Sequence, residues 1–257
     1  MSVTAIAKQA APIRAIATRV LPPTVMRAYR ASHGRWHRSD PLLFGMNARP
    51  GPLVSLYDEI KDLPGYFTYD DVVAFTLLLH TQHISGVTGD ILEIGSYHGR
   101  STAVIGRCVQ PHERFIICDT FERPAEETYP EPPSAAGLRR TLDRLAPDLR
   151  SVDIRESRSD ELDLDGVTLR FVHIDGGHTY DVALHDLRLT AAHLGPGGII
   201  AVDDYQHPDW QDVTAAVDIF VAESGFEVVA DVNRWGESGR KIYLSRPSAA
   251  PAIPSFA

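Results

Sequence analysis

Three aspartates stand where two apolar segments of the chain end. Asp175 closes the run Leu169–Asp175, and Asp203 and Asp204 lie near the end of Gly197–Tyr205. If the two segments are neighbouring parallel strands, their carboxyl ends meet at one edge of a sheet and the three carboxylates converge. Crowded carboxylates raise one another's pKa, and a hard divalent ion with oxygen ligands and residual waters relieves that repulsion. The alternative is that one aspartate caps a helix and another contacts a cofactor amine, without a metal.

A histidine, His178, follows Asp175 by three residues, just past the predicted strand end. Its ordinary pKa near neutrality suits it to remove a proton from a hydroxyl group as a general base. Two other roles stay open, a hydrogen bond to Asp175 and a plain substrate contact. Four other histidines are of less interest: His173 is expected to be a packed core residue, His207 follows the second acidic segment closely enough to touch a substrate, and His185 and His193 are expected on the solvent side of a helix.

A glycine-containing turn follows the first predicted strand, Ile91–Ser96. Gly95 and Gly99 let the backbone approach a ligand closely and direct the N–H groups of the next helix towards it. The third glycine of a G-x-G-x-x-G fingerprint is missing, which disfavours a dinucleotide site. Asp119 ends the second strand, about 20–25 residues beyond the turn, where an acid can accept hydrogen bonds from ribose hydroxyls. The alternative for Asp119 is a helix N-cap.

The elements that must position these groups alternate between strands and helices. Short, nearly continuous apolar runs predict strands buried on both faces, and the spacing of the apolar residues between them predicts helices. Five β/α repeats followed by two strands without an intervening helix predict a doubly wound, mostly parallel sheet that ends in an antiparallel hairpin. The predicted strands are Ile91–Ser96, Arg114–Thr120, Val152–Ser157, Leu169–Asp175, Gly197–Tyr205, Phe226–Val232 and Lys241–Ser245, and the predicted helices are Arg100–Val109, Ala135–Leu145, Asp181–Leu194 and one that begins near Pro208.

Before the first strand, Thr68-Tyr69-Asp70-Asp71 predicts a capping box that opens a helix. Val72, Phe75 and Leu79 fall on one face of that helix. We therefore divide the chain into a helical extension or lid at 1–65, a ligand-binding domain at 66–247 and a disordered tail at 248–257.

Several motifs together resemble the class I methyltransferases that depend on S-adenosylmethionine (SAM). The segment Gly89–Thr102 looks like their first motif, and Asp119 within Ile116–Phe121 looks like their second. The later segments Phe171–Tyr180 and Gly197–Tyr205, with Ala216-Val217-Asp218-x-Phe220, resemble the macrocin-type and related sugar O-methyltransferases of actinobacterial metabolism, several of which need Mg²⁺. The resemblance covers roughly residues 60–246.

The resemblance implies a Rossmann-like α/β domain with a seven-stranded sheet that transfers a methyl group to a hydroxyl of a sugar or glycosylated small metabolite. It implies that Asp119 holds the SAM ribose and that Ser157 lies near the adenine. It implies Mg²⁺ as the metal, with His178 as general base beside Asp175. The full cofactor-binding set is Glu93, Gly95, Ser96, Tyr97, Gly99, Ser101, Asp119, Thr120 and Ser157, and the metal set is Asp175, Asp203 and Asp204.

Composition narrows the range of partners. The net charge of −9 disfavours a protein that coats nucleic acid, and no apolar run approaches the length of a membrane span. Residues 1–40 carry seven Lys or Arg and one acid, which fits a docking arm, a membrane-surface helix or a solvated segment. Cys108 and Cys118 lack redox or zinc spacing, so we expect reduced thiols in a cytoplasmic protein. Homo-oligomers are common in the resembled subgroup.

Two other functions remain open. A catalytically silent SAM-binding scaffold would have no use for clustered carboxylates, which disfavours it. An NAD-dependent oxidoreductase is disfavoured by the missing third glycine and by the terminal hairpin.

Overall fold

The computed structural model describes residues 52–122, 129, 131–234 and 239–247. The basic segment 1–40 and the predicted tail 248–257 lie outside these residues. The described chain belongs to a compact unit that begins at Pro50. Among the described residues, no helix combines the length and the apolar character needed to cross a membrane.

The core is a seven-stranded sheet with the strand order β3-β2-β1-β4-β5-β7-β6. Strands β1 to β5 are mutually parallel, whereas β7 pairs antiparallel with both β5 and β6. The predicted doubly wound sheet with a C-terminal antiparallel hairpin is therefore confirmed. The strands are β1 (Asp90–Ile94), β2 (Phe115–Asp119), β3 (Val152–Glu156), β4 (Leu169–Ile174), β5 (Leu194–Tyr205), β6 (Glu227–Asn233) and β7 (Arg240–Ser245).

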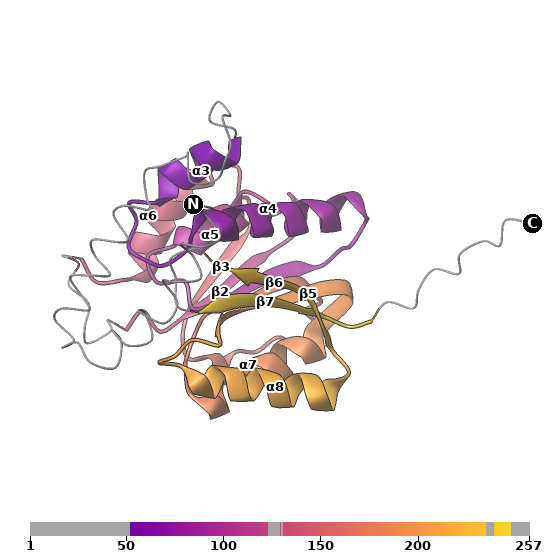
Figure 1. The fold of residues 1–257 in the computed structure, drawn as a ribbon. Helices are drawn as coiled ribbons and strands as arrows, with labels where there is room; N and C mark the ends of the chain where they lie inside the picture. The colour runs from indigo at the N-terminus through magenta and orange to yellow at the C-terminus, as the bar shows by residue number, and fades with distance from the viewer. Residues whose placement is uncertain (1–51, 123–128, 130, 235–238, 248–257) are drawn as a thin grey trace, which may run out of the picture. The chain divides into compact units, whose positions relative to one another are not determined.

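Helices cover both faces of the sheet (Figure 1). One face packs against α7 and α8, and the other packs against α3, α4, α5 and α6. Successive strand residues point to opposite faces, so Ile242 of β7 belongs to the first core and its neighbour Tyr243 to the second. The helices are α3 (Pro52–Ile60), α4 (Tyr69–Ile84), α5 (Arg100–Gly106), α6 (Ala135–Leu145), α7 (Tyr180–His193) and α8 (Gln211–Ser224), with a short 3₁₀ helix at Ser159–Glu161.

The predicted capping box is present at the start of α4. The hydroxyl of Thr68 accepts from the backbone N–H of Asp71 (3.3 Å), and the Asp71 carboxylate accepts from the backbone N–H of Thr68 (2.8 Å). Val72, Phe75 and Leu79 are fully buried, as their spacing predicted. The buried face of α4 therefore packs over β1, β4, β5 and β7, whose residues share its core.

Three element boundaries lie three residues from the sequence prediction, and one of them is the start of α8, at Gln211 instead of near Pro208. β5 begins at Leu194 instead of Gly197, because Leu194 already pairs with Leu169 before a register shift. Helix α5 ends at Gly106 instead of Val109, and beyond it the N–H of Cys108 bonds to Ile105 in a tightened last turn. Helix α3, within the segment assigned to the extension, buries Leu56 and Ile60 in the domain core.

Candidate active site

The turn after β1 is held by the carboxylate of Asp119. Its Oδ2 accepts from the backbone N–H of Ser96 (2.6 Å) and Tyr97 (2.7 Å) and from the Ser96 hydroxyl (2.9 Å), and its Oδ1 accepts from the N–H of Phe121 (2.7 Å). Asp119 is not a helix N-cap, because the side chain of Ser134 caps the following helix, α6. It orders the predicted cofactor turn, and its contact with a ribose stays a prediction.

Both glycines of the turn have positive φ, and a side chain on Gly95 would collide with backbone, whereas one on Gly99 would require Leu138 to move. A Cβ on Gly95 (φ +84°) would lie 2.0 Å from the carbonyl oxygen of Asp175, and one on Gly99 (φ +88°) would lie 2.6 Å from Leu138 Cδ1. The N–H of Asp175 also donates to the carbonyl of Ile94 (2.8 Å). The predicted cofactor turn is therefore in direct contact with the predicted catalytic acid.

Glu93, at the end of β1, is fully buried beside the turn. Its Oε1 accepts from the hydroxyl of Ser101 (2.6 Å) and lies 2.9 Å from Nδ1 of His173. Its Oε2 is buried without a hydrogen-bond partner among the described residues. An unpartnered buried carboxylate oxygen next to a close-approach glycine turn fits a cofactor with a cationic group, as SAM has in its ammonium and its sulfonium.

Thr120 and Ser157 lie where β2 and β3 end. The Thr120 side chain is exposed, and its hydroxyl accepts from the N–H of Glu122 (3.4 Å). The N–H of Ser157 donates to the carbonyl of Asp119 (3.1 Å), and its own carbonyl accepts from the thiol of Cys118 (3.4 Å). Ser157 is thus adjacent to Asp119, where the resemblance expects the nucleoside.

The three predicted metal ligands fall into two overlapping clusters of the described residues, and Asp175 is common to both. Ligand atoms of Asp175, His178 and Asp204 lie within 4.8 Å of one another, as do those of His173, Asp175 and Asp203. Burial and the charge of Asp203 raise the pKa of Asp175 well above its usual range. A divalent ion that keeps several waters needs only one or two carboxylates, so Asp175 and Asp204, with His178 beside them, fit such an ion.

His178 is paired and stacked. Its Nε2 lies 3.0 Å from Oδ2 of Asp204, and its ring stacks on Trp210 with a centroid distance of 4.3 Å and an interplanar angle of 17°. About a third of the side chain stays exposed (34%). A neutral imidazole that donates from Nε2 to Asp204 keeps a lone pair on Nδ1, the arrangement that a general base needs. His207 lies on the same side, 6.1 Å from the Trp210 ring.

Asp203 is paired with two cationic side chains that were not among the residues predicted from sequence. Arg234 contacts its Oδ1 at 2.5 Å and its Oδ2 at 3.1 Å, and Lys241 contacts its Oδ2 at 2.7 Å. Although burial opposes ionisation, these two charges hold the pKa of Asp203 well below its usual range. Although burial disfavours a charged lysine, Asp203 and Asp71 raise the pKa of Lys241 above its usual value.

His173 is buried, as predicted, but it also has polar contacts. Its Nε2 lies 2.8 Å from Nζ of Lys241, and its Nδ1 faces Glu93. Burial and the charge of Lys241 lower its pKa, so the ring is neutral, donates from Nδ1 and accepts at Nε2. A signal for His173 existed in the sequence, since it is a polar side chain inside an apolar strand, whereas Lys241 follows Arg240 at the start of its strand and carried no such signal.

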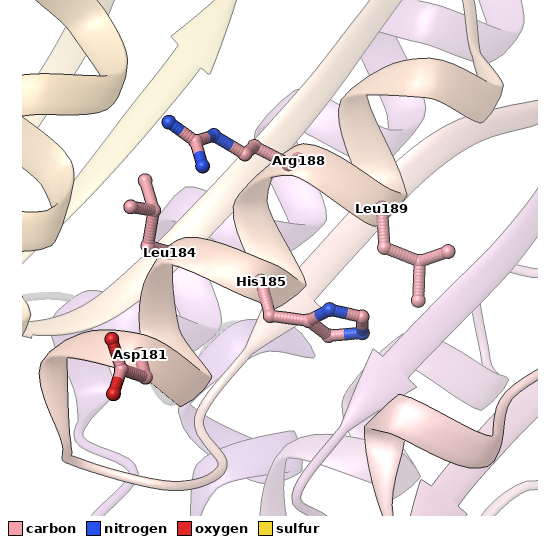
Figure 2. Close-up of a pocket in the computed structure, with 5 residues that line it drawn as sticks. All are labelled: Asp181, Leu184, His185, Arg188 and Leu189. Atoms are coloured by element: carbon pink, nitrogen blue, oxygen red, sulfur yellow. The ribbon is translucent and has the colours of Figure 1, made fainter.

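A surface hollow lies elsewhere, along α7 (Figure 2). It is lined by one stripe of that helix, Asp181, Leu184, His185, Arg188 and Leu189. His185 is exposed there, as predicted. Because every lining residue comes from one helix and none of the predicted site residues is among them, this hollow is not the candidate active site.

Comparison with known proteins agrees with this geometry. Residues 92–205 match the family model described as a methyltransferase domain. That segment contains the glycine turn, Asp119 and the acidic ends of β4 and β5. No curated protein matches the chain.

Solved O-methyltransferases share the fold. The O-methyltransferase NovP is 20% identical, with a TM-score of 0.57 over 76% of this chain and 88% of NovP. TomG from Streptomyces achromogenes, involved in tomaymycin synthesis and solved with SAM, is 18% identical, with a TM-score of 0.53 over 81% of this chain and 96% of TomG. CalS11, a TDP-rhamnose 3′-O-methyltransferase of calicheamicin biosynthesis, is 18% identical, with a TM-score of 0.50 over 77% of this chain and 96% of CalS11. The chain therefore has a Rossmann-like methyltransferase fold.

Proposed function

We propose that this chain is a SAM-dependent O-methyltransferase that methylates a hydroxyl of a sugar or glycosylated small molecule, with assistance from a divalent metal ion. One observation carries the proposal. The His178–Asp204 pair and Asp175 stand at the carboxyl ends of β5 and β4, and the backbone of Asp175 touches the glycine turn at Gly95. A proton acceptor and a candidate cofactor turn are therefore neighbours at one edge of the sheet.

The cofactor side is formed by β1 and β2. Bound SAM supplies an electrophilic methyl group on a sulfonium. Glu93 offers its unpartnered carboxylate oxygen to a cationic group of the cofactor. Asp119 keeps the turn in shape. Its Oδ1 accepts one hydrogen bond from the described residues and can accept a second from a ribose hydroxyl.

The acceptor side is formed by His178 and its neighbours. His178 takes the hydroxyl proton at Nδ1, while Asp204 fixes the ring tautomer from Nε2 and stabilises the resulting imidazolium. Such general base catalysis contributes typically about 10²–10⁴-fold to the rate. A metal ion held by Asp175 and Asp204 would orient a pair of acceptor hydroxyls and lower their pKa.

The class of acceptor is proposed from two features. Trp210 is 40% exposed beside His178, and a partly exposed aromatic ring offers an apolar face to a sugar ring. CalS11, which shares this fold, is a TDP-rhamnose 3′-O-methyltransferase. We therefore place a sugar or glycoside hydroxyl at Nδ1 of His178.

The test combines binding with turnover. Isothermal titration calorimetry with SAM and with its demethylated product, S-adenosylhomocysteine (SAH), measures the cofactor site, and labelled SAM with a panel of glycosides measures transfer, each with and without EDTA. We expect SAH binding in the micromolar range and transfer to at least one glycoside that EDTA reduces. Titration with NAD⁺ serves as the negative control.

Absence of binding by both SAM and SAH would overturn the assignment. Transfer at the same rate with EDTA would remove the metal from the proposal and keep the base. SAH binding without transfer to any hydroxyl compound would favour the scaffold alternative.

A further inference from the structure

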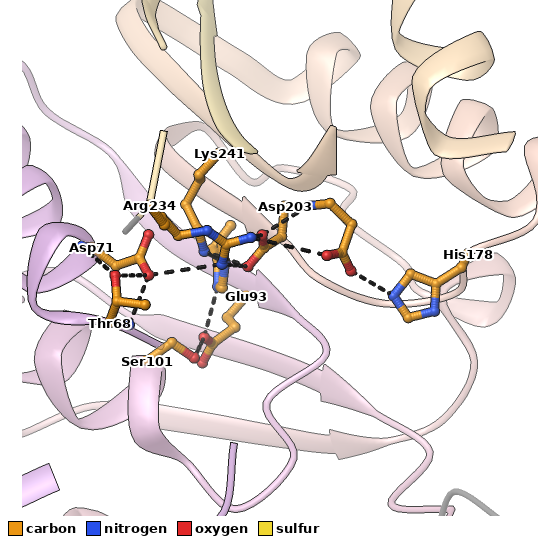
Figure 3. A network of polar contacts seen from close by, with 10 residues as sticks. Thr68, Asp71, Glu93, Ser101, His178, Asp203, Arg234 and Lys241 are labelled. Carbon is orange, nitrogen blue, oxygen red and sulfur yellow. Dashed lines mark hydrogen bonds and ion pairs between the residues drawn. The ribbon is translucent and has the colours of Figure 1, made fainter. Parts of the chain in front are cut away.

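A row of buried charged and polar side chains joins residues of four strands, and Figure 3 draws the contacts between them. It runs from Ser101 through Glu93 and His173 to Lys241 and Asp203, with successive contacts of 2.6, 2.9, 2.8 and 2.7 Å. Glu93 and His173 are register partners across β1 and β4. The row therefore links the glycine-turn helix to the acidic end of β5 along one face of the sheet.

The carboxylate of Asp203 has no free capacity in this row. A carboxylate offers about four lone-pair sites. Here four donors occupy them: Oδ1 receives the N–H of Asp204 (2.7 Å) and Arg234 Nη2, and Oδ2 receives Lys241 Nζ and Arg234 Nη1. A divalent ion on Asp203 would have to displace one of these donors and approach two fixed positive charges.

The surrounding side chains hold Lys241 in this position. It is fully buried, and its ammonium lies 5.0 Å from the ring centroids of both Phe67 and Phe75 as well as against Asp203 and His173. Arg234 is nearly fully buried too and lies 3.8 Å from Asp71 of the α4 capping box. Both cations are held from several sides, so the position of Asp203 is set by the fold.

Asp203 in turn sets the conformation of the next residue. Asp204 has φ +58°, a left-handed conformation that disfavours a residue with a Cβ. The hydrogen bond from its N–H to Oδ1 of Asp203 supports that conformation, and Oδ2 of Asp204 then reaches His178. Gly239 leaves the necessary space, since a Cβ there would lie 3.1 Å from Cα of Asp204.

We propose that Lys241 and Arg234 are positioning residues that fix Asp203 as the anchor of the Asp204–His178 pair, and that Asp203 is therefore not a metal ligand. The inference concerns the site of the proposed function and rests on that function only for its effect on turnover. It assigns the metal to Asp175 and Asp204 and gives Asp203 a role through its neighbour.

The experiment compares four variants of the full chain: Lys241→Met, the charge-balanced double variant Asp203→Asn/Lys241→Met, Asp204→Asn and, as an exposed control, Asp165→Asn. The ¹⁵N signals of the His178 ring, assigned with His178→Gln, report the pair with Asp204. Calorimetry with Mn²⁺ reports the metal site, and calorimetry with SAH reports the cofactor site. Circular dichroism confirms that each variant is folded.

The double variant separates the two roles of Asp203. Its amide oxygen still accepts from the N–H of Asp204, and the loss of one negative charge is matched by the loss of one positive charge. We expect its Mn²⁺ Kd to stay within threefold of wild type, whereas Asp204→Asn weakens Mn²⁺ at least tenfold. A folded double variant that loses Mn²⁺ as Asp204→Asn does would make Asp203 a ligand and overturn the inference.

The single variant tests the positioning itself. In Lys241→Met the His178 signals should move towards those of Asp204→Asn, and kcat should fall at least tenfold while the Kd of SAH changes less than threefold. Wild-type His178 signals in a folded Lys241→Met variant would overturn the positioning role. If wild type binds neither SAH nor Mn²⁺, the proposed function fails, and the His178 signals still decide this inference.

Discussion

Replacing Asp119 with asparagine removes the charge from a side chain that accepts four hydrogen bonds around the glycine turn. Three donors, from Ser96 and Tyr97, meet Oδ2, and the N–H of Phe121 meets Oδ1. In Asp119→Asn, the single amide oxygen takes the place where three donors converge, because that orientation keeps the larger number of hydrogen bonds. The new NH₂ group then faces the N–H of Phe121, which loses its acceptor.

The magnitude follows from these contacts. One hydrogen bond is lost, and three change from charged to neutral acceptors. Hydrogen bonds to charged groups contribute about 1.5–3 kcal/mol and neutral ones about 0.5–1.5 kcal/mol, so the middle of these ranges gives a total loss of at most about 6 kcal/mol. Part of it lowers the free energy of unfolding. At least about 1.4 kcal/mol, tenfold in Kd, should fall on the binding of SAH, because the same carboxylate is proposed to hold the ribose.

Calorimetry with SAH measures the affinity, and urea denaturation measures the stability of the same samples. Asp165→Asn is the matched control, since it removes one exposed carboxylate from the loop between β3 and β4. An SAH Kd within twofold of wild type in folded Asp119→Asn would refute the assignment of the cofactor to this turn.

Three further outcomes are expected. His178→Gln should lower kcat at least about 100-fold in the labelled-SAM assay and leave the SAH Kd within threefold. His185→Gln, on the exposed stripe of α7, should change neither quantity. Equal losses of kcat in the two variants would exclude the base role. Burial raises the pKa of Asp186 to about 6, so the native chain holds this proton more tightly than the unfolded chain and the free energy of unfolding falls as pH rises from about 4 to 6. In urea denaturation at pH 5 and 7.5, Asp186→Asn should abolish that fall and stabilise the protein at pH 7.5 by at most about 3 kcal/mol. An unchanged pH dependence would contradict this. Glu113→Gln breaks a buried ion pair with Arg170 (2.6 Å) at the opposite end of β4. The free energy of unfolding should fall by about 3–5 kcal/mol, and the SAH Kd should change less than threefold. A stability change below about 1 kcal/mol would mean that the pair is not buried in solution.

Much of the fold could be predicted because local patterns determine it. The capping box at Thr68 and the apolar spacing of α4 are local features, and the observed helix begins and buries residues as they predict. The apolar runs located each strand to within one or two residues at most ends. Parallel strands also end at a common edge, and for that reason Asp175 lies close to Asp204, as the sequence predicted.

The charged row could not be predicted in the same way, because it depends on the register between strands far apart in sequence. Val202 of β5 faces Ile242 of β7, and this register places Lys241 beside Asp203. No local pattern contains that register. Nothing in the sequence indicated that Arg234 lies near the site either, since it stands beyond the end of β6 and reaches Asp203 only through the folded sheet.

Asp203 differs from Asp175 and Asp204 in how its charge is compensated, and this difference affects which ligands the site can bind. Asp203 is neutralised from within the chain by Lys241 and Arg234, permanently and at close range. Arg234 is 3.9 Å from Asp204, too far for a hydrogen bond. The protein cations therefore stabilise the interior of the acidic cluster and leave its outer edge electronegative. An edge of that kind favours cationic ligands, and both the sulfonium donor and the divalent ion of the proposed reaction are cations.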